Sequence, residues 1–307
     1  MKSDIGVIGA GSLGTAISQR LAENSDNVVV LARKAEIRDD INQNRLNSQY
    51  YPNQTLNEGI TATTDINDLA GCGIIFLAIP SSAFRNTLSE LKGVIDDDAI
   101  LVTTAKGIEY PSLKTMGDLI GEYFANSYVA MSGPNFASEI MLNQPTITNV
   151  SSRNRKNAEA VRDALSTKQF KVKIIDDIRG IELCGVLKNI NAIANGICEG
   201  MNINENARYA ILTKGFKDTI EILKAFGACE ETAHEYCGFG DLMLTSTSSE
   251  SRNHTLGILY GQRLIIDEAA SGIVFEGAFL IGCAVQNVNR QAHNRRNQHQ
   301  TDCGEIP

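Results

Sequence analysis

The sequence of 307 residues predicts an α/β domain built on a parallel sheet, followed by an all-helical domain. Apolar runs of strand length alternate with helical segments up to about residue 176, which is typical of a parallel sheet covered by helices. From residue 178 onward, helical periodicity continues without strand signals. We therefore expect an α/β domain over residues 1–178, a helical domain over residues 179–284 and a polar tail over residues 285–307.

A glycine turn follows the first apolar run, residues 5–8. It reads Gly9-Ala10-Gly11-Ser12-Leu13-Gly14 and leads into a helix over residues 15–22 and a second strand over residues 27–31. In this setting Gly9 permits the tight turn, Gly11 lets the backbone approach a pyrophosphate, and Gly14 lets the helix pack on the strand. The helix N-terminus offers amide protons to the anion. The motif, placed between a strand and a helix, predicts a Rossmann-type dinucleotide-binding domain.

The end of the second strand bears on the choice between NAD and NADP. Proteins that bind NAD place an acidic residue there for the ribose 2′-hydroxyl, whereas proteins that bind NADP supply cations for the 2′-phosphate. This chain has Ala32-Arg33-Lys34, and Arg33 is the better candidate because its planar fork matches a phosphate. The alternative is a pair of exposed surface cations. We expect a preference for NADP(H), with NAD(H) possible.

Three further apolar runs predict strands that are buried on both faces of the sheet. They cover residues 73–79, 99–104 and 128–131; a strand over 145–151, a helix over 154–167 and a strand over 170–175 complete the domain. We expect Ser81 or Ser82 to cap the helix after residue 80. Ligands of open α/β sheets bind beyond the carboxyl ends of the strands, which is where Lys106 and residues 133–137 fall.

The helical half is expected to contain helices over residues 180–201, 205–226, 229–237 and 252–263. The first is apolar nearly all round, which indicates a helix buried inside its domain. Lys188 and Asn189 lie in its middle. Burial lowers the pKa of a lysine toward neutrality, so its amine could exchange a proton at pH 7. The alternative is a lysine whose stem covers apolar surface while its head reaches water.

Polar groups further along the chain could complete a site. Gly238-Phe239-Gly240-Asp241 is a glycine turn that delivers a carboxylate, and Ser251-Arg252-Asn253 stands where a helix begins. Amide donors and a guanidinium at a helix start make an anion cradle. The alternative is N-capping by Ser251, with Arg252 on the surface. Asn206-Ala207-Arg208 opens another helix, which also carries Lys214.

Composition excludes several classes of function. A net charge of -8 argues against a nucleic-acid partner, because phosphate backbones require a basic surface. The seven cysteines contain no CxxC pair, which suits a reducing cytoplasm, and the four histidines lack metal-ligand spacing. We therefore expect no metal site. No apolar run is long enough to span a bilayer and the N-terminus carries no export signal, so we expect a cytoplasmic protein without membrane insertion.

Seven motifs closely resemble those of the bacterial NAD(P)-dependent glycerol-3-phosphate dehydrogenase family, and they follow one another in the same order as in that family. They are Gly9-Ala10-Gly11-Ser12-Leu13-Gly14, Ala105-Lys106-Gly107, Ser132-Gly133-Pro134-Asn135-Phe136-Ala137, Gly185-Val186-Leu187-Lys188-Asn189, Asn206-Ala207-Arg208, Gly240-Asp241-Leu242 and Ser251-Arg252-Asn253. The resemblance covers roughly residues 4–277. It implies a helical domain like the C-terminal domain of 6-phosphogluconate dehydrogenase, a possible homodimer, and interconversion of dihydroxyacetone phosphate and sn-glycerol 3-phosphate for phospholipid synthesis.

The resemblance also implies roles for individual residues. Lys188 matches the family's proton acceptor. Matches to substrate positions are Lys106, Gly133, Asn135, Lys188, Asp241, Ser251, Arg252 and Asn253. Matches to cofactor positions, beside the three glycines, are Ser12, Leu13, Arg33, Lys106, Ala137, Arg252, Val274 and Glu276. The residues themselves support this chemistry, because Lys188 can give a proton to the developing alkoxide and Lys106 can lower the pKa of Lys188. Asp241 could orient Lys188 or hold a substrate hydroxyl.

Two departures from the family pattern stand out. Leu13 replaces an aromatic residue, and the sequence from Phe279 to Pro307 does not look like the helical continuation that the family usually has. Two other functions are therefore weighed. One is a related 3-hydroxyacid or ketopantoate-type reductase, which should lack the Ser251-Arg252-Asn253 cradle. The other is a non-catalytic dinucleotide-binding protein, against which the presence of Lys106, Lys188 and Asp241 argues.

Overall fold

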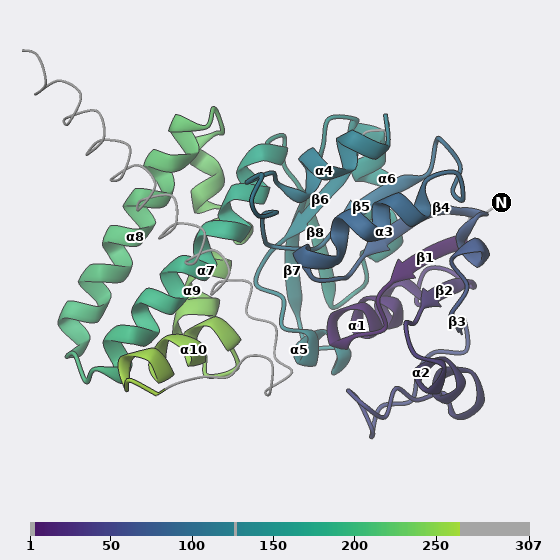
Figure 1. Ribbon diagram of the computed structural model, residues 1–307, viewed down its shortest axis with the longest axis horizontal. Coiled ribbons are helices and arrows are strands. Elements are labelled where there is room, and N and C mark those ends of the chain that lie inside the picture. Colours follow the sequence, from purple (N-terminus) through teal and green to yellow (C-terminus); the bar gives the residue numbers. More distant parts are fainter. Residues whose placement is uncertain (1–3, 126–127, 265–307) are drawn as a thin grey trace, which may run out of the picture.

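The computed structural model describes residues 4–125 and 128–264. A sheet with helices on both faces forms one half of the molecule, and helices α7 to α10 form the other (Figure 1). The last strand ends at Ile174 and α7 begins at Ile178. We propose that the boundary between the two domains lies at residues 178–179. The expected tail, residues 285–307, lies outside the described residues.

The sheet has eight strands in the order β3-β2-β1-β4-β5-β6-β7-β8. Their bounds are β1 Asp4–Ile8, β2 Val28–Leu31, β3 Ile60–Thr63, β4 Cys72–Leu77, β5 Ile100–Thr103, β6 Val129–Ser132, β7 Thr146–Ser152 and β8 Phe170–Ile174. Every neighbouring pair is parallel except β6 and β7, so the expected parallel sheet is confirmed, with one antiparallel pair that the sequence did not indicate. The chain turns back after β6 through α5 (Ala137–Met141), a helix of five residues. Such a helix is too short to carry the chain along the whole sheet, as a parallel crossover requires.

Side chains on the two faces of the sheet form two separate cores. Along β4, Ile74 and Phe76 join the core under α1 (Ser12–Leu21), α5 and α6 (Arg155–Leu165). Ile75 and Leu77 join the core under α3 (Phe84–Leu91) and α4 (Met116–Tyr123). This alternation is the period of two that strands impose, and burial on both faces explains why the strands are continuously apolar. The expected strands are confirmed; β3 and the short α2 (Ala35–Asp39) were not expected.

Two local expectations are wrong. A 3-10 turn over Ser81–Ala83 precedes α3, and Pro80 and Ala83 occupy the N-cap positions, so neither serine caps that helix. The expected helix over residues 229–237 is a 3-10 turn (Glu230–His234) and a π-helical turn (Tyr236–Gly240). Asn149 of β7 accepts a hydrogen bond from the Cys237 amide at 2.8 Å, which holds this segment against the sheet. A further helix, α9 (Asp241–Thr247), covers a segment that was expected to be a glycine turn followed by hydroxyl-rich chain.

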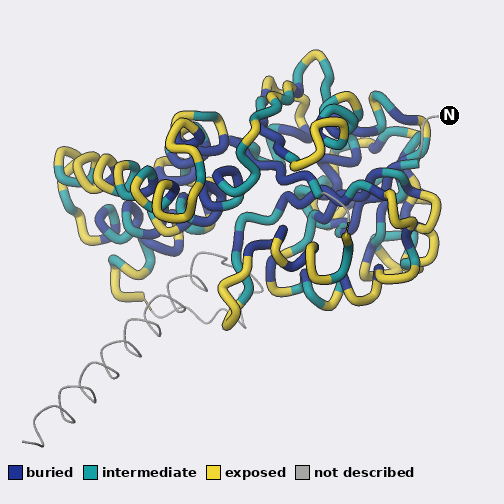
Figure 2. Tube along the Cα trace, turned by 90° about the horizontal axis from the view of Figure 1, so that it is seen from above, coloured by how far each residue is buried: buried dark blue, intermediate teal, exposed yellow. Residues whose placement is uncertain are grey.

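The long helix α7 (Ile178–Gly200) is the centre of the helical domain, between α8 (Glu205–Ala225), α9 and α10 (Arg252–Gly261). Figure 2 shows buried chain through the middle of the sheet domain and exposed chain along the outer helix of the other half. Near its start, α7 joins the sheet domain through Glu182, which accepts hydrogen bonds from the Gly117 amide at 2.8 Å and the Tyr128 hydroxyl at 2.9 Å. The first half of α7 is therefore fixed to the α/β domain.

Helices α7 and α10 approach each other through glycines. A Cβ atom added to Gly196 would lie 2.2 Å from the carbonyl oxygen of His254, and one added to Gly257 would lie 2.3 Å from that of Ile193. Gly200 and Gly261 meet the facing backbone in the same way. Backbone cannot give way as a flexible side chain can, so this crossing requires glycine at these positions.

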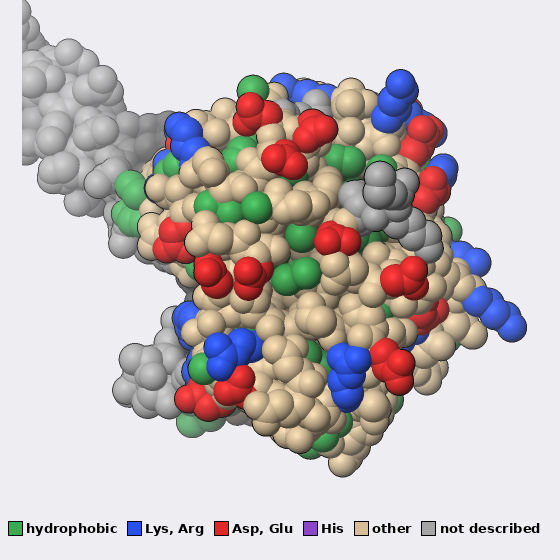
Figure 3. All heavy atoms as spheres, turned by 90° about the vertical axis from the view of Figure 1, so that its right-hand side faces the viewer, with side chains coloured by type: hydrophobic (Ala, Val, Ile, Leu, Met, Phe, Trp, Pro, Cys, Tyr) green, Lys and Arg blue, Asp and Glu red, His purple; other side chains and the backbone are tan. Residues whose placement is uncertain are grey.

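The described surface carries mixed charge. On the end of the sheet domain that is remote from the helical domain, acidic and basic side chains are interspersed (Figure 3). The described part of this face therefore offers no continuous basic patch for a phosphate backbone.

None of the helices in the described ranges is long and apolar enough to cross a membrane.

The crossing of α7 and α10 provides a test of the packing. We expect Gly196→Ala to lower the free energy of unfolding by about 1–3 kcal/mol, because the new methyl group overpacks a rigid contact. Gly121→Ala in α4 is the matched control: its Cβ would meet nothing within 4 Å, so helix propensity should leave stability equal or slightly higher. Thermal and urea denaturation would measure both variants. Equal stability of Gly196→Ala and wild type would contradict the packing described here.

Candidate functional site

The glycine turn between β1 and α1 has the shape that the sequence predicts. Gly9 has φ +109°, and a Cβ there would lie 2.5 Å from the carbonyl oxygen of Ala78. A Cβ on Gly14 would lie 1.8 Å from the carbonyl oxygen of Gly9, whereas a Cβ on Gly11 would meet nothing within 4 Å. Gly11 is also the N-cap of α1. The turn therefore leaves open space at the position where the backbone must approach a pyrophosphate, and its residues fit a dinucleotide.

The other expected cofactor residues lie around this turn. Arg33 and Lys34 are exposed directly beyond the carboxyl end of β2. Ser12 is the first residue of α1, and Leu13 is half-buried against the core under α1. Ala137 begins α5. Val274 and Glu276 lie outside the described residues.

Three charged side chains from distant parts of the chain meet at the junction of the two domains. Lys188 of α7 and Lys106 of the loop after β5 both contact Asp241, the first residue of α9. Lys188 Nζ lies 2.6 Å from Asp241 Oδ1, and Lys106 Nζ lies 2.7 Å from Asp241 Oδ2. The two ammonium groups thus hold opposite oxygens of one carboxylate.

Burial and charge act against each other in this cluster. Burial, the largest effect, and the nearby Lys106 lower the pKa of Lys188, the Asp241 carboxylate raises it, and the net pKa is about 8. Burial raises the pKa of Asp241, but the two lysines outweigh this effect and hold the pKa below its usual value. Asp241 therefore stays ionised, while Lys188 can lose its proton near neutral pH. Lys188 is buried, which rules out the alternative of a lysine whose head reaches water.

Two residues that sequence reasoning did not assign to the site complete it. Thr245 Oγ1 accepts a hydrogen bond from Lys188 Nζ at 2.8 Å, and it lies one helical turn after Asp241. Asn189 donates from Nδ2 to the carbonyl oxygen of Lys106 at 3.0 Å and accepts from Asn253 at 2.9 Å. Asn189 could have been found as a polar neighbour of Lys188 in an apolar helix. Thr245 could not, because its position depends on α9, which was not expected.

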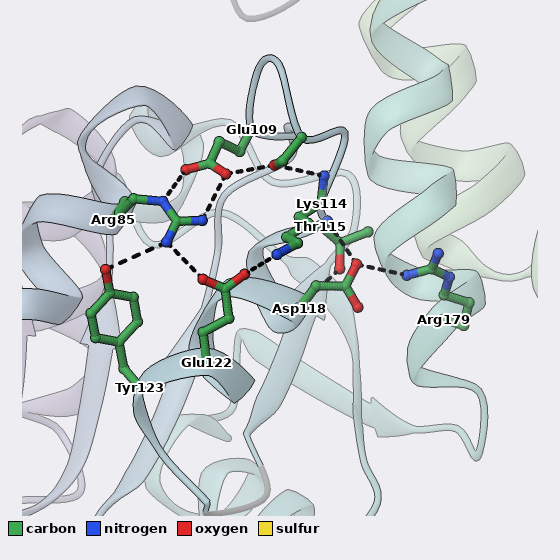
Figure 4. Close-up of polar contacts among 9 residues, drawn as sticks. Arg85, Glu109, Lys114, Thr115, Asp118, Glu122, Tyr123 and Arg179 are labelled. Carbon is green, nitrogen blue, oxygen red and sulfur yellow. Dashed lines mark hydrogen bonds and ion pairs between the residues drawn. The ribbon is translucent and has the colours of Figure 1, made fainter.

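Lys106 is fixed from several directions. Its Nζ donates to the carbonyl oxygen of Gly133 at 2.9 Å, and its side chain passes α7 at Gly185, where a Cβ would lie 3.3 Å from Lys106 Cγ. The loop after it is held by an ion-pair network (Figure 4). Arg85 of α3 pairs with Glu109, with Nη2 and Oε2 2.8 Å apart, and with Glu122 of α4 at 2.7 Å. These contacts fix the loop only three residues beyond Lys106.

The loop after β6 lies tightly against β7. A Cβ on Gly133 would lie 2.9 Å from Thr148 Cα, so the loop accepts no side chain there. Asn135 Nδ2 donates to the carbonyl oxygen of Ile147 at 3.0 Å. Both residues thus shape a loop whose first carbonyl already contacts Lys106.

The Ser251-Arg252-Asn253 segment begins α10, as expected. Ser251 is buried and caps the helix, accepting a hydrogen bond from the His254 amide at 3.2 Å. Arg252 is exposed, and Asn253 reaches Asn189. The described contacts of Ser251 are thus those of a capping residue, and Asn253 connects this segment to the lysine cluster.

Arg208 and Lys214 of α8 have other partners. Arg208 pairs with Glu199 near the end of α7, about three turns beyond Lys188, and Lys214 pairs with Asp218 on its own helix. The structure therefore does not bring these two cations to Asp241.

Comparison with known proteins identifies the family. The N-terminal model of NAD-dependent glycerol-3-phosphate dehydrogenase matches residues 4–158, and the C-terminal model matches residues 177–296. The second match corrects the expectation that the resemblance ends near residue 277.

Similar proteins carry the same name. A glycerol-3-phosphate dehydrogenase [NAD(P)+] of Halothermothrix orenii is 37% identical over 280 residues, which are 90% of this chain and 82% of that protein. The crystal structure of glycerol-3-phosphate dehydrogenase from Coxiella burnetii is 30% identical with a TM-score of 0.87, covering 95% of this chain and 90% of that one. The enzyme from Saccharomyces cerevisiae is 26% identical with a TM-score of 0.81, covering 91% and 88%. With both family models matched across most of its length, the chain belongs to the NAD-dependent glycerol-3-phosphate dehydrogenase family.

Proposed function

We propose that this protein catalyses the NAD(P)H-dependent reduction of dihydroxyacetone phosphate to sn-glycerol 3-phosphate, and the reverse oxidation, for phospholipid synthesis. The observation that carries the proposal is the buried Lys188 ammonium, paired with Asp241 beside Lys106 at the domain junction. Family membership and the glycine turn that fits a dinucleotide support it. A related hydroxyacid or ketopantoate-type reductase and a non-catalytic nucleotide-binding protein are not favoured.

Lys188 is the proposed acid and base. A bound reduced nicotinamide supplies the hydride, and the carbonyl oxygen of the substrate then needs a proton. Protonated Lys188 gives that proton and becomes neutral; in the oxidation, neutral Lys188 takes the proton from the hydroxyl. A pKa of about 8 makes both forms accessible near neutral pH. Asp241 and Thr245 hold Nζ in one position throughout.

Lys106 is proposed to stabilise negative charge on the substrate oxygen. Its ammonium group pairs with Asp241, as that of Lys188 does, so it lies close to the proposed proton donor. Gly133 and Asn135 would shape the substrate loop. Ser251, Arg252 and Asn253 would bind the substrate phosphate, with Arg252, which is exposed, supplying the guanidinium and also contacting the cofactor.

The cofactor is proposed to lie on the turn formed by Gly9, Gly11 and Gly14. Ser12, Leu13, Lys106 and Ala137 would contact it, with Val274 and Glu276 from beyond the described residues. Exposed Arg33 and its neighbour Lys34 favour NADP(H) over NAD(H), because two cations at the end of β2 can pair with a 2′-phosphate. The homodimer stays a prediction from the family resemblance, and the cytoplasmic location stays a prediction from the sequence.

The role of Lys188 is tested by Lys188→Ala. We expect the kcat for dihydroxyacetone phosphate reduction to fall by about 10²–10⁴, because the proton donor is lost. NADPH binding, measured by the fluorescence of the cofactor, should stay within about twofold of wild type. Lys217→Ala, at an exposed position of α8, is the matched control and should leave kcat unchanged. Unchanged turnover in Lys188→Ala would remove this residue from the mechanism.

The pH dependence gives a second test. Since the reduction needs protonated Lys188, its kcat/KM should fall as the pH rises through about 8, and that of the oxidation should rise over the same interval. Asp241→Asn removes the carboxylate that stabilises the ammonium, so the midpoint should move to lower pH. Profiles from about pH 6 to pH 10 would measure this shift. A midpoint that stays in place would show that Asp241 does not tune Lys188.

Cofactor preference is tested by Arg33→Ala. We expect the KM for NADPH to rise about tenfold and that for NADH to change less than about twofold, because only the 2′-phosphate loses a charge-assisted partner. Arg155→Ala, on the surface of α6, is the control. Equal effects on the two cofactors would overturn the assignment of Arg33.

A further inference from the structure

Asn47 lies in the segment between α2 and β3 and is only 1% exposed. Its side-chain amide reaches the glycine turn. Nδ2 donates to the carbonyl oxygen of Ala10 at 3.0 Å and to Thr15 Oγ1 at 2.8 Å. Because an amide nitrogen carries two protons, these two contacts use its whole donor capacity. One side chain therefore joins the glycine turn to the first turn of α1.

Tyr51, four residues later, contacts Ser12, the residue that follows Gly11. Its hydroxyl donates to the carbonyl oxygen of Ser12 at 3.0 Å and lies 2.7 Å from Ser12 Oγ. Its backbone amide donates to the carbonyl oxygen of Asn47 at 2.7 Å, so the two residues form one compact turn. Asn47 and Tyr51 thus hold the residues immediately before and after Gly11.

The glycine turn needs such support for a physical reason. Glycines permit its geometry but do not impose it, because glycine has more backbone freedom than any other residue. Gly11 has nothing within 4 Å of its Cβ position, so no contact on that side fixes the turn. A binding loop that is already held in the bound shape loses less entropy when the ligand arrives.

We propose that Asn47 is a positioning residue for the dinucleotide, which fixes the glycine turn in its pyrophosphate-binding shape, with Tyr51 as its partner. This inference rests on the proposed function, since it assumes that the turn binds NADPH. Asn47 acts through Ala10 and Thr15 and does not contact the reacting atoms.

Asn47→Ala tests the proposal. We expect the Kd for NADPH, from titration of the cofactor's own fluorescence, and the KM for NADPH to rise about tenfold, because the buried hydrogen bonds to Ala10 and Thr15 are lost. The kcat at saturating NADPH and the KM for dihydroxyacetone phosphate should stay within about twofold, because the lysine cluster is untouched. Asn44→Ala is the matched control: Asn44 is exposed three residues before Asn47 and contacts Asp40, so the Kd of this variant should equal that of wild type.

Thr15→Val is a second variant that keeps the shape of the side chain and removes one of the two acceptors. We expect its Kd for NADPH to rise about threefold and its melting temperature to fall by a few degrees, because one proton of the buried Asn47 amide loses its acceptor while the rest of the packing is kept. If Asn47→Ala fails to fold, this variant decides. Wild-type Kd in folded Asn47→Ala, or in Thr15→Val, would overturn the positioning role. Failure of the wild-type protein itself to bind NADPH would instead overturn the proposed function.

Discussion

The structure depends on the ion pairs that the Asp241 carboxylate makes with Lys188 and Lys106. A carboxylate as buried as this one would be costly alone, since removing charge from water is compensated only by partners at close range. Here each oxygen has an ammonium group, and Thr245 donates to Oδ1 at 3.1 Å. Because Lys106 comes from the sheet domain and Lys188 and Asp241 from the helical domain, the cluster also joins the two domains.

Helix α7 connects the polar cluster to the sheet domain at one end and to α10 at the other. Glu182 near its start attaches it to α4 and to Tyr128, the residue before β6. Lys188 and Asn189 in the middle carry the polar cluster, and the glycines of its last turns admit α10. The close crossing brings Ser251 and Asn253 at the start of α10 toward Asn189. A shift of α7 would therefore move Lys188, the proposed proton donor, and the proposed phosphate-binding segment together.

On the sheet-domain side of the site, Lys106 is accompanied by elements that contribute mainly backbone. The glycine turn, the tightly packed Gly133 loop and the amide end of α1 offer shape and main-chain donors rather than charged side chains. Such elements need external contacts to hold them. Asn47 and Tyr51 supply these contacts for the glycine turn, and Asn135 supplies them for the loop after β6.

The sequence by itself determined the features that local pattern encodes: the glycine turn, the buried strands, the long apolar helix and the presence of a lysine in its middle. It failed where the outcome depends on partners distant in the chain. The pairing of β7 antiparallel to β6 is one such outcome, and the turns around Cys237 are held by Asn149 of β7. Only the tertiary structure placed Thr245, Asn189 and Asn47, because their roles arise from hydrogen bonds to residues on other elements. Periodicity reports which face of an element is buried, and it carries no information about which polar group will be found on the other side of the contact.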